Sequence, residues 1–213
     1  MDSQWAAENL QTIRTLMERS ALYRRALAPI MTFVGALGLA GAIAGRVLNL
    51  NSPVGFILFW GLVAGVAMTG SFVLVRRQAL RDAEPFWSPP TRRVTQAFLP
   101  PLLGGLVLSA VVAARVHNLD ASRDIEALAF LVLPRSWIIL YGCALHSAGL
   151  FMPRGMKVLG WFFVLCGAGL FAVDTEALPR LDAGYGLMGF FFGLVQLAYG
   201  FYLYFTEKGK NGV

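Results

Sequence analysis

The segment 186–205, "GLMGFFFGLVQLAYGFYLYF", is a run of twenty residues without one charge. A helix of about 20 apolar residues crosses the hydrocarbon core of a bilayer, where every backbone polar group needs an internal hydrogen bond. Five more apolar runs of comparable length precede it. The sequence therefore predicts an all-α membrane protein, a bundle of six transmembrane helices at Ala26–Gly45, Val54–Val75, Ala97–Ala114, Pro134–Phe151, Met156–Val173 and Tyr185–Phe205.

Composition supports this class, because only 14% of the residues are charged, against about 25% in an average soluble domain. Residues 1–25 precede the first span and show one apolar stripe at helical spacing, through Ala6, Leu10, Ile13 and Met17. We expect three parts: a cytoplasmic amphipathic helix over 1–25, the bundle over 26–205 and a cytoplasmic tail over 206–213. The lipid bilayer is the first partner that this organisation implies.

The charges predict the orientation of the bundle. With the N-terminus inside, 13 of the 18 Lys and Arg residues fall on the inner side and 5 on the outer side, while the 12 acids divide six and six. An excess of Lys and Arg marks cytoplasmic loops, so both termini are expected in the cytoplasm. This sidedness accounts for the net charge of +6 without a nucleic-acid partner.

The segment "EPFWSPPTRRV" (84–94) joins the second and third expected spans. Ser88 suits the cap of a helix that begins with Pro89 and Pro90, because proline at a helix start loses no hydrogen bond. Trp87, Arg92 and Arg93 suit the membrane interface. We interpret the segment as an interfacial elbow that anchors the chain on the cytoplasmic side; docking of a cytoplasmic partner is the alternative.

The start of the fourth span allows two interpretations. Pro134 favours a break, which would leave 122–132 as a short surface helix and place Arg135 among the lipid headgroups. A single kinked helix would instead bury Arg135, and a buried intramembrane arginine would mark a functional position. The break is the preferred interpretation.

Small residues recur on one face of several expected spans, which is how helices approach closely in lipid. The candidate packing positions are Gly41, Gly45, Gly61, Gly65, Gly142, Gly149, Gly189 and Gly193. Each glycine pair is a weak signal alone, but together they predict a compact bundle.

Intramembrane polar residues usually face the bundle interior. His146, Gln196 and Tyr199 lie five, nine and six residues from the inner ends of their spans, so their depths differ by about 6 Å. We expect a polar cluster if spans four and six touch; it is either structural hydrogen bonding or a ligand or proton site. Spans four and five are joined by the short turn "MPRG", so residues whose numbers add up to about 307 should lie at the same depth. Cys143 and Cys166 add up to 309 and could meet; they are either small apolar residues or a site of copper or redox chemistry.

No catalytic motif is visible, and the two histidines, His117 and His146, are expected at opposite membrane surfaces. The sequence therefore predicts no enzyme activity, no cofactor and no metal site.

The runs "IRTLMERS", "EPFWSPPTRR" and "LYGCALHSAGLFMPRG" resemble a group of uncharacterised bacterial multi-pass membrane proteins. The resemblance implies a protein of the bacterial inner membrane and carries over no catalytic residue. The scarcity of buried polar chemistry and the many small-residue faces suggest an accessory or assembly subunit that acts through helix–helix contacts with other membrane subunits or further copies of itself. A small transporter or channel for a neutral or small solute, using the polar cluster, is the alternative.

Overall fold

The computed structural model describes residues 27–81, 87, 89–118, 126–173 and 180–208. Over these residues the protein is helical and contains no strand, which confirms the all-α class. The elements are a first helix at Leu27–Val47, α2 (Pro53–Arg81), α3 (Pro89–Asn118), η1 (Leu128–Val132), α5 (Leu133–Ala148), α6 (Arg154–Gly169), α7 (Arg180–Met188), η2 (Gly189–Val195) and α8 (Gln196–Lys208). The amphipathic helix expected over 1–25 lies outside the described residues.

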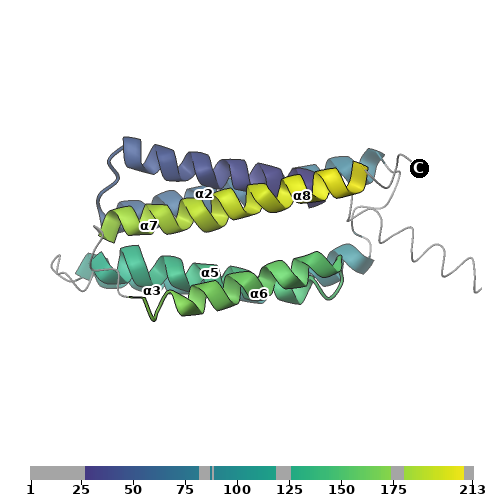
Figure 1. Cartoon of the computed structure of the whole chain (residues 1–213). Coiled ribbons are helices and arrows are strands. Elements are labelled where there is room, and N and C mark those ends of the chain that lie inside the picture. The colour runs from purple at the N-terminus through teal and green to yellow at the C-terminus, as the bar shows by residue number, and fades with distance from the viewer. Residues whose placement is uncertain (1–26, 82–86, 88, 119–125, 174–179, 209–213) are drawn as a thin grey trace, which may run out of the picture.

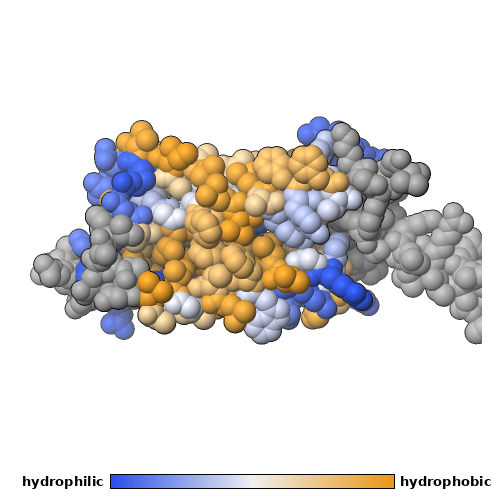
Figure 2. All heavy atoms as spheres, viewed as in Figure 1, coloured by the Kyte–Doolittle hydropathy of each residue, from blue (hydrophilic) through white to orange (hydrophobic). Residues whose placement is uncertain are grey.

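Among the described residues, five continuous helices are long and apolar enough to cross a membrane: Leu27–Val47, Pro53–Arg81, Thr91–Val116, Leu128–Ala148 and Arg180–Thr206. Together with the shorter α6, they run side by side in two layers: the first helix, α2 and α7–α8 form one layer, and α3, α5 and α6 form the other (Figure 1). Apolar side chains cover the middle of the visible face, and hydrophilic residues gather at the two ends (Figure 2). The chain therefore has the form of a multi-pass membrane protein.

The fifth expected span, Met156–Val173, is shorter than the sequence suggests. It corresponds to α6, which has 16 residues and hence a length of about 24 Å, less than the roughly 30 Å of a hydrocarbon core. α6 packs antiparallel against α5 along its length. The predicted count of six spans is therefore not confirmed; five helices meet the length of a membrane span.

The buried core lies between the first helix, α5, α6 and the last span. Met31, Ile138, Phe163 and Phe191 belong to one cluster that joins these four helices. α2 and α3 are peripheral: only 11% and 6% of their apolar stretches are buried, against 33–50% in the other three spans. The other described helices therefore leave most of the surface of α2 and α3 uncovered.

The chain continues as a helix through Pro134, so the preferred break before the fourth span is wrong. The Leu133 N–H donates to the Leu128 carbonyl, five residues back, and this wider π-helical turn accommodates the proline. Proline lacks an N–H, and its ring would clash with the carbonyl four residues earlier in a regular α-helix. Arg135 consequently lies inside the span, only 7% exposed, with its guanidinium carbon 5.6 Å from the centre of the Phe171 ring.

The connection between the first helix and α2 is closed by local hydrogen bonds. Asn49 adopts the left-handed conformation (φ 51°), and the N–H groups of Asn49 and Leu50 donate to the carbonyls of Arg46 and Gly45. This pattern satisfies the last carbonyls of the helix. Ser52 then caps α2, since its side-chain oxygen accepts from the Gly55 N–H at 3.0 Å. The short loop therefore holds the ends of both helices together.

Candidate functional site

The first and last membrane helices pack backbone to backbone through glycines. A Cβ atom on Gly38 would overlap the Phe192 carbonyl, and one on Gly35 would lie 2.5 Å from the Leu197 nitrogen. Gly193, on the last span, faces the backbone of Leu39 in the same way. The numbers of facing residues add up to 230–232, so the two helices run antiparallel in one register.

The two helices of the α5–α6 hairpin also pack backbone to backbone through glycines. A Cβ atom on Gly142 would lie 2.8 Å from the backbone nitrogen of Val164, and one on Gly160 would lie 2.5 Å from the backbone nitrogen of His146. These pairs add up to 306, one residue from the sum of 307 expected from the turn between the spans. Cys143 and Cys166 are both half-buried free thiols.

Other expected packing glycines also face neighbours. Gly41 lies against Trp60 and Val63 of α2, Gly45 against the Tyr185 ring, Gly149 against Lys157 and Gly189 against the Ala42 methyl group. Bulky side chains are therefore excluded at these positions by contacts within this chain.

Gly61 and Gly65 of α2 behave differently. Both are exposed, and a Cβ atom on either would meet no atom of the described residues within 4 Å. Thr69 continues this line one turn further, with its hydroxyl donating to the Gly65 carbonyl at 2.9 Å. We call Gly61, Gly65 and Thr69 the α2 glycine face. Two other described glycines, Gly169 and Gly186, also meet open space, but neither forms a one-turn pair with another open glycine.

Spans four and six do touch, through a pair that includes only one residue of the expected polar cluster. Gln196 is fully buried, and its Nε2 donates to the Tyr141 hydroxyl at 2.9 Å. The Gln196 Oε1 atom has no hydrogen-bond partner among the described residues. The rings of Phe98, Phe163 and Phe192 surround Tyr141 at centroid distances of 5.2–6.5 Å. A polar pair thus lies in an aromatic environment at the centre of the bundle.

His146 and Tyr199 lie elsewhere. The His146 ring packs edge-on against Trp161 at 5.2 Å, and its Nδ1 atom is buried without a hydrogen-bond partner in the described part of the chain. The Tyr199 hydroxyl lies beside Gly155, 2.6 Å from where a Cβ would stand, and is also unpartnered among those residues. The described structure contains no hydrogen bond that joins His146, Gln196 and Tyr199 to one another.

The sequence analysis missed Tyr141, although its depth was a usable signal. Tyr141 lies ten residues from the expected inner end of span four and Gln196 nine from that of span six, so the two are more nearly level than Gln196 and His146.

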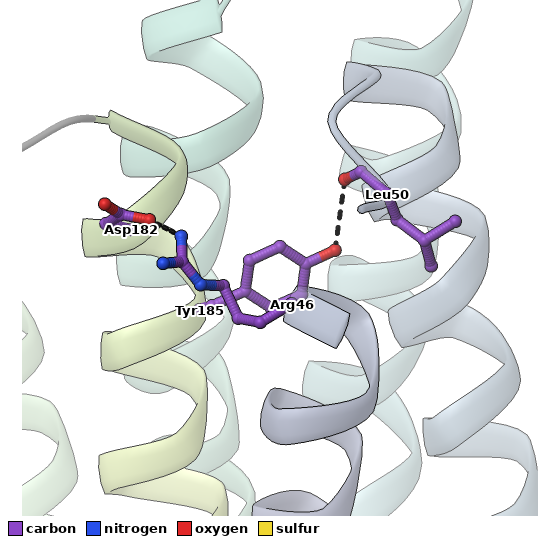
Figure 3. A network of polar contacts seen from close by, with 4 residues as sticks. All are labelled: Arg46, Leu50, Asp182 and Tyr185. Carbon is purple, nitrogen blue, oxygen red and sulfur yellow. Dashed lines mark hydrogen bonds and ion pairs between the residues drawn. The ribbon is translucent and has the colours of Figure 1, made fainter. Parts of the chain in front are cut away.

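The end of the bundle where the first helix meets α2 carries a network of polar contacts (Figure 3). Arg46 forms an ion pair with Asp182, and the Tyr185 hydroxyl donates to the Leu50 carbonyl at 3.2 Å. Arg46 and Asp182 also line an open hollow of about 560 Å³, together with Val47, Asn49, Asn51 and Leu181. Since both charged side chains are more than a third exposed, their pair contributes at most about 1 kcal/mol. The network fixes the start of α7 to the loop before α2.

Part of the interfacial elbow expected at 84–94 lies within the described residues. α3 begins at Pro89 and continues through Pro90, and Arg92 and Arg93 in its first turn are exposed. Trp87 is exposed as well, whereas Ser88 lies outside the described residues. Within the described ranges, no group of three or more His, Cys, Asp and Glu side chains is placed to hold a metal ion.

The chain matches no protein-family model, no curated protein and no solved structure.

Proposed function

We propose that this protein is a non-enzymatic accessory or assembly subunit that binds another membrane helix through the α2 glycine face. The observation that carries the proposal is the open space over Gly61 and Gly65. Their spacing of four residues in an apolar helix is typical of a helix-association face.

The glycines that are packed inside the bundle support this interpretation. Gly35 and Gly38 receive the backbone of the last span, and Gly142 and Gly160 receive the backbones of α6 and α5. Small residues allow such approach, whereas lipid chains give a glycine no comparable packing. A partner helix on α2 would use Gly61 and Gly65 as the bundle uses its buried glycines.

We further propose that α6 is a short crossing, which brings the number of crossings to six, and that both termini are cytoplasmic, in a bacterial inner membrane. The antiparallel packing of α6 along α5 supports the crossing. A span a few ångströms too short is accommodated by local thinning of the bilayer at modest cost. The division of 13 basic residues inside and 5 outside supports the orientation.

The experiment is purification of the tagged chain from its native membrane in mild detergent, followed by native mass measurement and identification of accompanying proteins. The test variant combines Gly61→Leu with Gly65→Leu. The control is Gly186→Leu, because Gly186 also meets open space but lies on α7. We expect a defined assembly with the unmodified chain and the control, and its loss with the α2 variant. A lone monomer from the unmodified chain, or an assembly indifferent to the α2 variant, would contradict the proposal.

A small transporter or channel for a neutral solute is the second candidate. The buried amide of Gln196 favours it, because its Oε1 atom has no hydrogen-bond partner among the described residues and a buried acceptor of this kind calls for one. The test is osmotic swelling of proteoliposomes in urea or glycerol. Swelling above empty liposomes that Gln196→Leu abolishes would support transport, and swelling equal to empty liposomes would remove it.

A further inference from the structure

One end of the bundle presents a surface of exposed arginines. Arg76, Arg77 and Arg81 lie in the last turns of α2, Arg92 and Arg93 in the first turn of α3, and Arg154 at the start of α6; we call these six residues the basic rim. All six side chains are exposed. Within the described part of the chain, none of them forms an ion pair with an acidic residue.

Packing brings the parts of the basic rim together. Val94 of α3 packs with Ala148, at the end of α5, in a cluster that also includes Phe98 and Met152. Met152 lies two residues before Arg154, so the first turn of α3 is held beside the start of α6. α2 in turn contacts α3, and its last turns precede α3 by only a short connection.

The opposite end of the bundle differs in charge. There Arg46 is paired with Asp182, and Glu126 adds a second described acid, so the cations are partly neutralised. At the basic rim, the described side chains include no acid. No described acid therefore neutralises the exposed guanidinium groups of the rim, and these groups are suited to bind an anion.

The surface below the rim is suited to acyl chains. Large apolar side chains on α2 and α3 are exposed within ten residues of the arginines along the same helices, among them Val73, Leu80, Leu99 and Leu103. An anion recognised here would have a charged head at the rim and hydrocarbon against these helices. Guanidinium groups bind phosphate oxygens in a fixed two-pronged geometry, which favours a phosphodiester over a diffuse charge.

We propose that the basic rim binds the phosphate headgroups of anionic phospholipids, with their acyl chains lying on α2 and α3. Cationic residues next to a membrane surface strengthen binding to anionic lipid. The proposal concerns the ends of α2, α3 and α6 and does not depend on a partner helix at Gly61 and Gly65.

The test uses the full chain in zwitterionic detergent, titrated with phosphatidylglycerol or phosphatidylcholine of matched chain length, with retained lipid counted by native mass measurement. The rim variant combines Arg92→Gln, Arg93→Gln and Arg154→Gln. The matched control is Arg115→Gln, which removes an exposed arginine from the other end of α3. We expect selective retention of phosphatidylglycerol by the unmodified chain and the control, and about fivefold weaker retention for each rim arginine removed.

Two measurements on the unmodified chain keep the test decisive if the rim variant fails to fold. Raising the salt concentration should weaken retention of phosphatidylglycerol but leave phosphatidylcholine unaffected. Excess inorganic phosphate should fail to displace the lipid, since the acyl chains contribute to binding. Equal retention of both lipids, or displacement by inorganic phosphate, would overturn the proposal, as would a folded rim variant that retains phosphatidylglycerol like the control.

Discussion

The Gln196 amide donates to the Tyr141 hydroxyl at 2.9 Å, and this hydrogen bond joins two membrane helices through residues 55 positions apart in the chain. Gln196 is fully buried and lies directly after η2, where the last span departs from regular α-helical hydrogen bonding. Polar pairs of this kind hold helices in register, because either partner alone would leave a polar group in an apolar interior.

This pair should be measurable by a double-mutant cycle. We expect Tyr141→Phe and Gln196→Leu each to lower the free energy of unfolding, with a coupling between them of roughly 0.6–1.7 kcal/mol, the range found for hydrogen bonds between membrane helices. Denaturation of the four proteins in detergent gives the value. Strictly additive effects would show that the hydrogen bond contributes nothing to stability.

The contact between the first and last spans predicts a sharp difference between two glycines. Gly38→Ala places a methyl group on the Phe192 carbonyl, and backbone atoms cannot move aside as a side chain can. We expect a loss of about 1–3 kcal/mol in the free energy of unfolding, typical of overpacking. Gly61→Ala is the control and should leave the stability of the monomer unchanged or slightly higher, because its methyl group meets open space.

Thermal unfolding of both variants in the same detergent distinguishes these cases. A Gly38→Ala protein as stable as the unmodified chain would mean that the first and last spans do not pack in the described register.

The network around Arg46 predicts that three substitutions lower the free energy of unfolding by different amounts. Tyr185→Phe removes only the hydroxyl that reaches the Leu50 carbonyl and should cost about 0.5–1.5 kcal/mol. Asp182→Asn should cost less than about 1 kcal/mol, because its ion pair with Arg46 is partly exposed. Tyr185→Ala also empties a buried site against Gly45 and Phe56, so we expect about 3–5 kcal/mol. Chemical denaturation in detergent measures the order, and a larger effect of Asp182→Asn than of Tyr185→Ala would contradict it.

The orientation can be tested with single cysteines after Cys143 and Cys166 have been replaced by alanine. Asn51→Cys and Val173→Cys place exposed thiols at one end of the bundle, and Trp87→Cys places one at the other. With both termini cytoplasmic, a membrane-impermeant maleimide should label positions 51 and 173 on intact cells, and position 87 only after permeabilisation. If position 173, like position 87, were labelled only after permeabilisation, α6 would not cross the membrane.

Much of the fold could be predicted because it follows from local pattern. Long apolar runs predicted the five membrane-spanning helices, and the short turn after Ala148 predicted the register of α5 and α6 to within one residue. Both are consequences of helix geometry over a short stretch of chain, where few alternatives compete.

The remainder depends on three-dimensional contacts that periodicity does not reveal. The sequence does not show that a π-helical turn lets the chain pass Pro134 without a break, which keeps Arg135 inside the span. Gly41 and Gly61 look alike in sequence, yet one faces Trp60 and the other meets open space. The partner of Gln196 likewise depended on which side chain of span four points toward span six, and this was Tyr141 rather than His146.

The pairing of the first helix with the last has a consequence for biosynthesis. Phe192 leaves the ribosome 154 residues after Gly38. At about 5–20 residues per second, the first helix waits roughly 8–30 s in the insertion machinery or the lipid before its partner is made. The three intervening described spans enter during this delay, so closing the bundle is a late step of biogenesis. A chain released before residue 192 would expose Gly35 and Gly38 to whatever membrane chaperone or protease is nearby.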